Sequence, residues 1–385
     1  MTSVRIRHTI VIKRFIMLFI SHEPVPEQGL KRSRRPRLVD VAELAGVSVA
    51  AVSVVLNNRI GQSARVSEET QQRVLAAARA LGYVANPLAR SLAGGRTNII
   101  AVFTFEAVFP LDHRDFYYPF LVGIEEEASR LGYDLLLLTS PDDENGKRHI
   151  YRDGINRLRI ADGSILLGFG SRPELEALLD EGYPFVFVGR RESSGDRVSY
   201  VAAGYAEATA DIVRMMFQHG HRRLAYLESA DNESAHDRRQ GLIQAHAQIG
   251  LTHDPALMWR GEPADYSPAV MTSLLRAGAT GFVVENDALG EKVLAVGKSL
   301  DLCCPADYSL AVLGDPLSLT APNYTWTTFK VPRREMGIEA VRLLVKMLDD
   351  TSEDRATPYR ATLPCTVVPG DTLGPPREHS FSDSE

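Results

Sequence analysis

The sequence has few cysteines and none of the short motifs that mark common enzymes. Three cysteines occur in 385 residues, Cys303, Cys304 and Cys365, and their spacing matches neither a metal site nor a disulfide framework. The chain has no G-x-x-x-x-G-K-[ST] phosphate loop, no G-x-G-x-x-G after a strand, no G-x-S-x-G elbow and no H-E-x-x-H pair. We therefore expect a protein that is not an enzyme, with no catalytic residues, metal or cofactor, in a reducing cytoplasm.

Long hydrophobic runs are also missing. The most apolar stretch near the start, residues 10–20, is interrupted by Lys13 and Arg14, and no small-residue cleavage site follows it. No segment reaches the roughly 18–20 apolar residues of a membrane span. Neither a secretory signal nor a membrane partner is therefore expected. Residues 1–36 are predicted to be a disordered basic extension, ending in the run KRSRRPR.

What the chain does have is an uneven distribution of charge. Residues 1–96 hold 15 lysine and arginine residues against 6 acidic ones, whereas the rest hold 28 against 43, which gives −6 overall. A basic first part on an acidic body indicates a segment that faces nucleic acid. The length predicts two or three domains, each able to bury its own core.

Residues 37–83 have the pattern of three short helices with a tight corner between the first two. Helices are expected over residues 39–45, 49–57 and 68–81. The residues expected at the corner and at the helix ends are Gly46, Ser48, Ser67 and Gly82. A second helix held in this way fits the DNA major groove, so residues 37–83 are predicted to be a helix-turn-helix domain.

A linker is expected over residues 84–97. Pro87 disfavours helix before it, and Gly94 and Gly95 break helix after it. The residues between them, LARSLA, are long enough for one or two helical turns, which would be marginal alone because a short helix bears the cost of nucleation.

From residue 98 onward, apolar strands alternate with amphipathic helices. Strands are expected at 99–105, 133–139, 163–169, 185–190, 223–229, 281–286 and 309–315. Helices are expected at 120–131, 206–220, 238–249, 268–277 and 288–300. This alternation predicts an α/β body, residues 98–372, with two lobes of doubly wound parallel sheet and a ligand between them at the carboxyl ends of the strands. Residues 373–385 are predicted to be a disordered tail.

Several motifs together point to one family. They are D-V-A-x-x-A-G-V-S at 40–48, G-Y-x-x-N at 82–86, A-R-S-L-A at 89–93, G-I-E-x-x-A-x-x-x-G-Y at 123–133, R-x-x-G at 238–241, N-D at 286–287 and T-T-x-x-x-P-x-x-x-M-G at 327–337. With these motifs the chain resembles the LacI/GalR family of bacterial transcriptional repressors over about residues 38–372.

The resemblance implies a helix-turn-helix head on a two-lobed body like a periplasmic binding protein. It further implies a homodimer that binds a pseudo-palindromic double-stranded DNA operator, and a small effector, with a sugar favoured, in the cleft. The linker would become a hinge helix on DNA and push Leu92, beside Ala93, into the minor groove. The residues at DNA-contacting positions are Leu38, Ser48, Val49, Ala50, Ser53, Val54, Asn57, Tyr83, Asn86, Leu92 and Ala93.

The second helix departs from the family pattern S-x-x-T-V-S-R. Ala51 replaces the threonine and Val54 the arginine, while Val49 and Ala50 stand where the family places its base-reading pair. Small apolar side chains can contact thymine methyl groups but cannot form bidentate hydrogen bonds with bases. Three alternatives follow: an unusual operator, specificity moved to the hinge and to DNA shape, or weakened DNA recognition.

The cleft departs from the family as well. Ala203 and Gly204 stand where Asp-Asn is common, and residues 312–315, VLGD, replace G-F-D-D. The residues expected to contact the effector are Phe116, Tyr117, Arg238, Asn286, Asp315 and Trp326. Arg238 is the strongest candidate because a guanidinium can fork onto hydroxyl or carboxylate oxygens. The aromatic residues fit core packing equally well, and a nucleoside, an acid or another metabolite remains an alternative to a sugar.

A transport-type soluble ligand-binding protein of the same two-lobed fold is the main alternative function. Such a protein would need a signal peptide and would lack a helix-turn-helix. The sequence has the opposite features, so a DNA-binding regulator, most simply a repressor, is the favoured interpretation.

Overall fold

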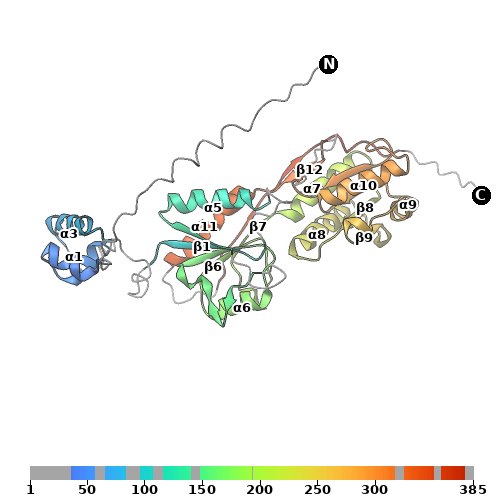
Figure 1. Ribbon diagram of the computed structural model, residues 1–385. Helices are drawn as coiled ribbons and strands as arrows, with labels where there is room; N and C mark the ends of the chain where they lie inside the picture. The colour runs from blue at the N-terminus through green and yellow to red at the C-terminus, as the bar shows by residue number, and fades with distance from the viewer. Residues whose placement is uncertain are drawn as a thin grey trace, which may run out of the picture. The chain divides into compact units, whose positions relative to one another are not determined.

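The computed structural model describes residues 36–56, 66–83, 96–106, 116–139, 148–192, 194–316, 325–350 and 357–377. The chain divides into two units, a head that ends at Gly95 and a body that begins at Arg96 (Figure 1). Four of the expected DNA contacts lie outside the described residues, namely Asn57, Asn86, Leu92 and Ala93.

The head consists of three helices around a small apolar core. They are α1 (Leu38–Ala45), α2 (Val49–Leu56) and α3 (Glu68–Leu81). Gly46 takes the left-handed conformation (φ 66°), and α2 leaves the corner at 105° to α1. The Ser67 hydroxyl accepts a hydrogen bond from the Thr70 amide, which caps α3. These helices confirm the predicted ones, with α1 beginning one residue earlier.

The first lobe of the body is built on a six-stranded parallel sheet with the order β13-β7-β6-β5-β1-β2. Its strands are β1 (Ile99–Thr104), β2 (Asp134–Leu138), β5 (Gly163–Leu167), β6 (Phe185–Val188), β7 (Tyr200–Ala203) and β13 (Arg360–Leu363). Its helices are α5 (Tyr118–Arg130), α6 (Arg172–Asp180) and α11 (Arg333–Asp349). A short hairpin of β3 (Tyr151–Arg152) and β4 (Ile155–Asn156) precedes β5.

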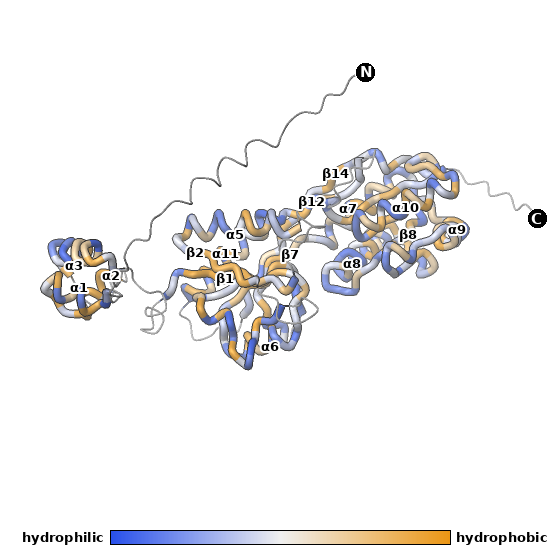
Figure 2. The backbone as a smooth tube through the Cα atoms, in the orientation of Figure 1, coloured by the Kyte–Doolittle hydropathy of each residue, from blue (hydrophilic) through white to orange (hydrophobic). Residues whose placement is uncertain are grey.

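In the central strands of this sheet, alternate residues are buried on opposite faces. Ile100 and Val102 join the core beneath α5 and α11, whereas Ala101 and Phe103 join the core beneath α6. Burial on both faces explains why the central strands are apolar along their length (Figure 2).

The second lobe has a four-stranded parallel sheet with the order β11-β10-β8-β9. Its strands are β8 (Leu224–Glu228), β9 (Met258–Arg260), β10 (Gly281–Val284) and β11 (Ser309–Val312). Helices α7 (Tyr205–Gln218) and α8 (Glu233–Gln248) share a core with one face of this sheet, and α9 (Pro268–Arg276) and α10 (Asp287–Ser299) share a core with the other. Two lobes of doubly wound parallel sheet confirm the predicted fold class.

The chain passes between the lobes three times, after β7, after β12 (Thr328–Lys330) and after β13. β12 pairs antiparallel with β14 (Thr366–Val368) beside the second lobe. The first lobe is therefore completed by α11 and β13, which follow the second lobe in sequence. The sequence did not predict these two elements, because α11 carries charges on its outer face and β13 is short.

Two glycines of the family motifs let α5 and α11 touch backbone to backbone. A Cβ atom on Gly123 would lie 2.0 Å from the carbonyl oxygen of Arg334, and one on Gly337 would lie 2.3 Å from that of Phe120. No larger residue fits at either position without separating the helices. The two helices therefore form one tightly packed pair.

Two expected boundaries were wrong. Helix α8 begins at Glu233 and not near residue 238, because the Asn232 side chain accepts a hydrogen bond from the Ala235 amide and caps the helix there. The body also continues past residue 372. The Gly374 carbonyl lies 2.9 Å from Nε2 of the buried His221, and Arg377 pairs with Asp307.

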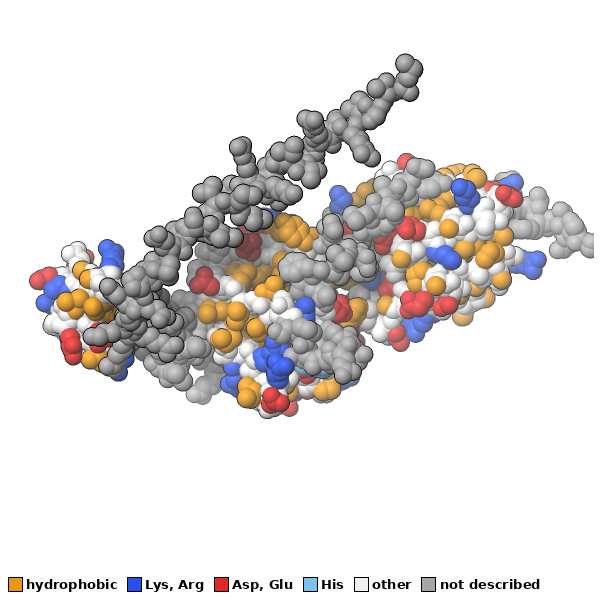
Figure 3. Space-filling model, in the orientation of Figure 1, with side chains coloured by type: hydrophobic (Ala, Val, Ile, Leu, Met, Phe, Trp, Pro, Cys, Tyr) orange, Lys and Arg blue, Asp and Glu red, His pale blue; other side chains and the backbone are white. Residues whose placement is uncertain are grey.

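Acidic and basic side chains are interspersed over the visible face of the body (Figure 3). Within the described ranges, no single helix is long and apolar enough to cross a membrane; α1 and α2 reach that composition only as a pair bent by 105°.

Candidate functional site

Helix α2 presents one face to solvent and buries the other. Val52 and Val55 lie in the head core with residues of α1 and α3, which fixes the orientation of the helix. On the opposite side Val49 is 42% exposed and Ala50 is also exposed, with Ser53 and Val54 half-buried beside them. The helix therefore offers the face on which the sequence placed the base-reading residues.

The other described head residues surround this helix. The Ser48 hydroxyl accepts a hydrogen bond from the Ala51 amide at 3.2 Å and so begins α2. Leu38 and Tyr83 are partly buried against the head core. Their role in packing is clear, and a contact with DNA remains a prediction for both.

Arg238 stands at the cleft end of the second lobe, on α8. Its side chain is 11% exposed, and its guanidinium carbon lies 4.1 Å from the centre of the Tyr205 ring. The nearest carboxylate is Glu285, at 4.0 Å from Nη1, and the buried Nε has no hydrogen-bond partner among the described residues. Arg238 thus has unused donor capacity, which a bound ligand could satisfy.

The glycine of the R-x-x-G motif holds Arg238 in this position. A Cβ atom on Gly241 would lie 2.1 Å from the carbonyl oxygen of Ala206, so α8 packs directly on the backbone of α7. Tyr205 begins α7, and Arg238 lies on α8 one turn before Gly241. The close approach of the two helices therefore sets the guanidinium over the Tyr205 ring.

Glu285 and Asn286 follow β10 and are held by the protein itself. Oε2 of Glu285 accepts hydrogen bonds from the amides of Ser229 and Ala230, at 2.7 and 2.9 Å. Asn286 caps α10 through the Leu289 amide, and its side-chain nitrogen donates to the Ser229 hydroxyl at 3.0 Å. This network fixes Asn286 at the end of the strand, and effector contact by it stays a prediction.

Asp315 and Phe116 meet at Arg333, the first residue of α11. Arg333 donates to Oδ2 of Asp315 at 2.6 Å, and its guanidinium carbon lies 5.2 Å from the centre of the Phe116 ring. The Val331 amide donates to the same Asp315 oxygen at 3.0 Å. Asp315 follows β11 of the second lobe and Phe116 precedes α5 of the first, so this group joins the lobes.

Tyr117 lies at the cleft end of the first lobe. Its hydroxyl donates to Oε2 of Glu106 at 2.6 Å, and burial, strengthened by this carboxylate, raises the pKa of the phenol. Arg148 donates to the Thr104 hydroxyl and to the Glu106 carbonyl, at 2.6 and 2.7 Å. Glu106 lies just after β1, whereas Arg148 lies just before β3, so two separate parts of the first lobe meet beside the Tyr117 hydroxyl.

Two adjacent arginines after β6 reach across to α8 of the second lobe. Arg190 pairs with Asp237 at 2.9 Å, and Arg191 pairs with Glu233 at 3.2 Å. The Arg191 guanidinium also lies 4.4 Å from the centre of the Phe187 ring. Burial lowers the pKa of Arg191, although Glu233 opposes the shift. The ion pairs bring the two lobes together at the turns that precede Arg238.

Trp326 packs in the core, which is one of the two alternatives that the sequence left open for it. Its side chain is buried in the apolar core of the second lobe, and a Cβ atom on Gly290 would lie 3.2 Å from its ring. It packs beneath α10, and effector contact by it stays a prediction.

The structure thus brings Phe116 and Asp315 together at Arg333, with Tyr117 against Phe116, and it places Arg238 over Tyr205. Effector contact by these residues remains a prediction, and residues that sequence reasoning missed lie beside them. The added residues are Glu106, Arg148, Arg190, Arg191, Tyr205 and Arg333. Charged residues directly after an apolar strand were the available signal for Glu106, Arg190 and Arg191. Within the described ranges, no cluster of three or more potential ligands could hold a metal ion.

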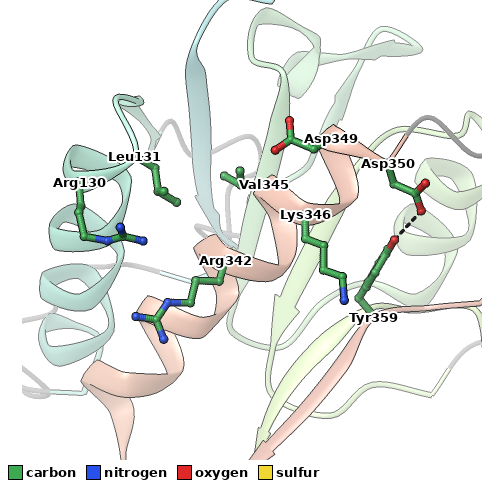
Figure 4. A pocket seen from close by; sticks show the side chains of 8 residues that line it. All are labelled: Arg130, Leu131, Arg342, Val345, Lys346, Asp349, Asp350 and Tyr359. Atoms are coloured by element: carbon green, nitrogen blue, oxygen red, sulfur yellow. Dashed lines mark hydrogen bonds between the residues drawn. The ribbon is translucent and has the colours of Figure 1, made fainter.

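A hollow lined by described residues lies elsewhere on the first lobe. It measures about 630 Å³ and lies along α11, facing the end of α5 and Tyr359 (Figure 4). Arg130 and Arg342 line it, and both already bind the buried Glu127. Together they lower the pKa of the Glu127 carboxyl to about 2. Because its charged groups are paired within the protein, this hollow shows no feature of an effector site.

Comparison with known proteins agrees with this geometry. A family model described as "Bacterial regulatory proteins, lacI family" matches residues 37–86. The model for "Periplasmic binding proteins and sugar binding domain of LacI family" matches residues 104–290, and "Periplasmic binding protein-like domain" matches residues 213–373.

Similar proteins align along most of the chain. The HTH-type transcriptional regulator CelR of Thermobifida fusca is 30% identical over 331 residues, which cover 84% of this chain and 95% of CelR. The repressor CytR of Escherichia coli K12 is 28% identical over 326 residues, 83% of this chain and 91% of CytR.

Two solved structures agree as well. That of the CelR–cellobiose complex has a TM-score of 0.57 at 27% identity and covers 88% of this chain and all of its own. That of the Lac repressor dimer bound to operator and the anti-inducer ONPF has a TM-score of 0.63 at 22% identity, which shows the fold, and covers 89% and 100%. With its helix-turn-helix head and two-lobed body, this chain belongs to the LacI family of bacterial transcriptional regulators.

Proposed function

We propose that this protein is a homodimeric repressor whose two heads bind a pseudo-palindromic operator and whose cleft binds a neutral, hydroxyl-rich effector such as a sugar. Effector binding changes the affinity of the heads for DNA. Because its target is DNA, its place of action is the cytoplasm. Like its relatives, it regulates transcription and is not an enzyme.

The observation that carries the effector proposal is the state of Arg238. Its Nε is buried with no acceptor among the described residues, and Glu285 lies 4.0 Å from its Nη1. A buried donor without a partner costs about 1–3 kcal/mol. A ligand oxygen at this position would remove that cost, which makes Arg238 the principal effector contact.

The balance of charge in the cleft favours a neutral ligand. Arg238 faces Glu285, Arg333 binds Asp315, and Arg191 binds Glu233, so positive and negative groups are matched. A charged ligand would leave one of these groups without its counterpart. Phe116 and Tyr205, each with an arginine against one side of its ring, add apolar surface beside these pairs, which suits the apolar face of a sugar ring. The solved complex of the relative CelR with cellobiose supports the same class.

The edge of the first sheet supports dimerisation. β2 is the last strand in the sheet order, and Leu135 and Leu137 on it are each 37% exposed. Exposed leucines along an unpaired edge are a surface that a second copy of the chain can cover.

Helix α11 connects the cleft with the linker. Arg333 begins it, and Asp349 ends it with a 2.6 Å ion pair to Arg96, a residue at the C-terminal end of the expected linker. At 1.5 Å per residue the helix is about 25 Å long. A shift of Arg333 on effector binding would therefore reach the C-terminal end of the linker through one rigid element.

Selection of binding sites from random DNA with the purified protein tests the DNA part of the proposal. An enriched sequence with approximate two-fold symmetry is expected. Lack of any enriched symmetric sequence would reject specific operator recognition. The effector class is tested by thermal shift with sugars and nucleosides, because a ligand that binds the folded state raises Tm. If only nucleosides or acids raised Tm, the sugar assignment would be wrong.

A further inference from the structure

The outward face of α2 is unusual in having almost no polar side chain. Val49, Ala50 and Val54 lie on this face with Ser53, while Val52 and Val55 fill the head core behind them. The whole helix reads VAAVSVVL. It contains no amide, guanidinium, imidazole or carboxylate side chain.

This composition limits how the helix can read a base pair. Bidentate hydrogen bonds to guanine or adenine come from arginine, lysine, asparagine or glutamine, and α2 has none of these between its bounds. The hydroxyl of Ser48, just before α2, already accepts a hydrogen bond from the Ala51 amide. Among the groups in the major groove of ordinary DNA, the 5-methyl group of thymine is the one that an apolar side chain can recognise.

We propose that α2 reads its operator through thymine 5-methyl groups, contacted by Val49, Ala50 and Val54. Each operator half-site would then carry thymines in the major groove opposite this face. This inference rests on the proposed binding of the head to operator DNA. DNA is the expected ligand of this face, because α2 belongs to a helix-turn-helix of a DNA-binding family and a basic run, residues 31–37, precedes α1.

The expected size of each contact is small. Removing one buried methyl group weakens a complex by about 0.8 kcal/mol, which is about fourfold in Kd. A symmetric operator presents each methyl twice, so the paired substitution should weaken binding by about 16-fold. Direct reading by α2 is therefore weaker than reading by bidentate arginine contacts.

Uracil substitution in the selected operator tests this proposal directly. Uracil pairs as thymine does and lacks only the 5-methyl group. Each thymine of a half-site is replaced in turn, symmetrically, and Kd is measured by fluorescence anisotropy at one fixed salt concentration. At one to three positions we expect about 16-fold weaker binding. Unchanged affinity with every thymine replaced would overturn methyl reading and leave DNA binding by the head intact.

Protein variants assign the methyl groups to side chains. Val49→Ala should shrink the uracil effect at one position and leave it unchanged at the others. Val39→Ala is the matched control, since Val39 lies on α1 and is 44% exposed. If Val39→Ala changed the uracil effect as much as Val49→Ala, α2 would not be the reader. Failure to select any operator would instead reject the proposed function itself.

Discussion

The candidate ligand site of the head and that of the body are built from opposite kinds of side chain. The outward face of α2 is apolar and carries no charge, whereas the cleft is formed by arginines and carboxylates that are largely buried. On α2 a lost side chain removes a small contact and leaves nothing unsatisfied. In the cleft a lost partner leaves a buried charge, which is costly. We therefore expect the head to tolerate substitutions that the cleft does not.

The largest expected effect is on the affinity of the head and its linker for operator DNA. If α2 reads DNA weakly, much of the operator affinity comes from the hinge, and Leu92→Gly should reduce it by about 100-fold, since it removes both the apolar wedge and a helix former. The Tm of the body should stay unchanged. Operator titration and calorimetry measure the two quantities.

Leu92→Met keeps an apolar side chain of similar size and serves as the control. It should retain most of the affinity. Equal operator affinity in Leu92→Gly and the parent protein would show that the hinge does not contribute and that the helix-turn-helix supplies the affinity.

The second effect is on the affinity of the body for its effector. Arg238→Ala should weaken binding of the effector identified by thermal shift by at least about tenfold, because it removes a buried donor that has no acceptor among the described residues. Operator binding without effector should change little. Arg214→Ala is the control, because Arg214 lies on α7 of the same lobe and makes an exposed pair with Asp211. Parent-like effector affinity in Arg238→Ala would show that the cleft contact lies elsewhere.

The smallest effect is a loss of stability at low pH, which we expect in the body and not in the head. Burial lowers the pKa of His221 and of His246, so the folded body keeps both neutral to a lower pH than the unfolded chain does. Unfolding lets them take up protons below about pH 6.5, so stability present above that pH is lost as pH falls. At pH 5.5 each histidine removes at most about 1.4 kcal/mol, and the Tm of the body should fall by a few degrees.

The head offers the internal control for this measurement, since residues 37–83 contain no histidine. Calorimetry at pH 7.5 and 5.5 records the change in the body, and amide exchange in α3 reports on the head under the same conditions. A body whose Tm is the same at both pH values would contradict neutral buried histidines.

Local features of the sequence were sufficient to predict the head helices. A glycine at φ 66° after α1 and a serine before α3 are signals that act within one turn of the helix they bound. The central strands of both sheets were also predictable, because burial on both faces makes them continuously apolar. The short strands β9 and β13 were not predicted. Arg238 was predicted from a motif, and the close contact of Gly241 with α7 now explains why that motif has its spacing.

The remaining features depend on contacts between distant parts of the chain. Arg191 is held by Glu233, which lies 42 residues away, and Arg333 by Asp315 across the lobes. Neither partner is marked by a local pattern. For Trp326 the sequence left ligand stacking and core packing open as alternatives, and the structure shows its ring packed with α10. Which side of an element faces the ligand is decided by tertiary packing.

The return of the chain to its first lobe has a consequence for synthesis on the ribosome. All four strands of the second sheet lie between residues 224 and 312 and are available together. The first sheet begins at residue 99, yet α11 must cover it and β13, residues 360–363, must join its edge. Domains generally fold as units while the chain emerges from its N-terminus. The lobe that is started first is therefore the one that is finished last, and a truncated chain lacking residues after 332 would expose the face of the sheet that α11 covers.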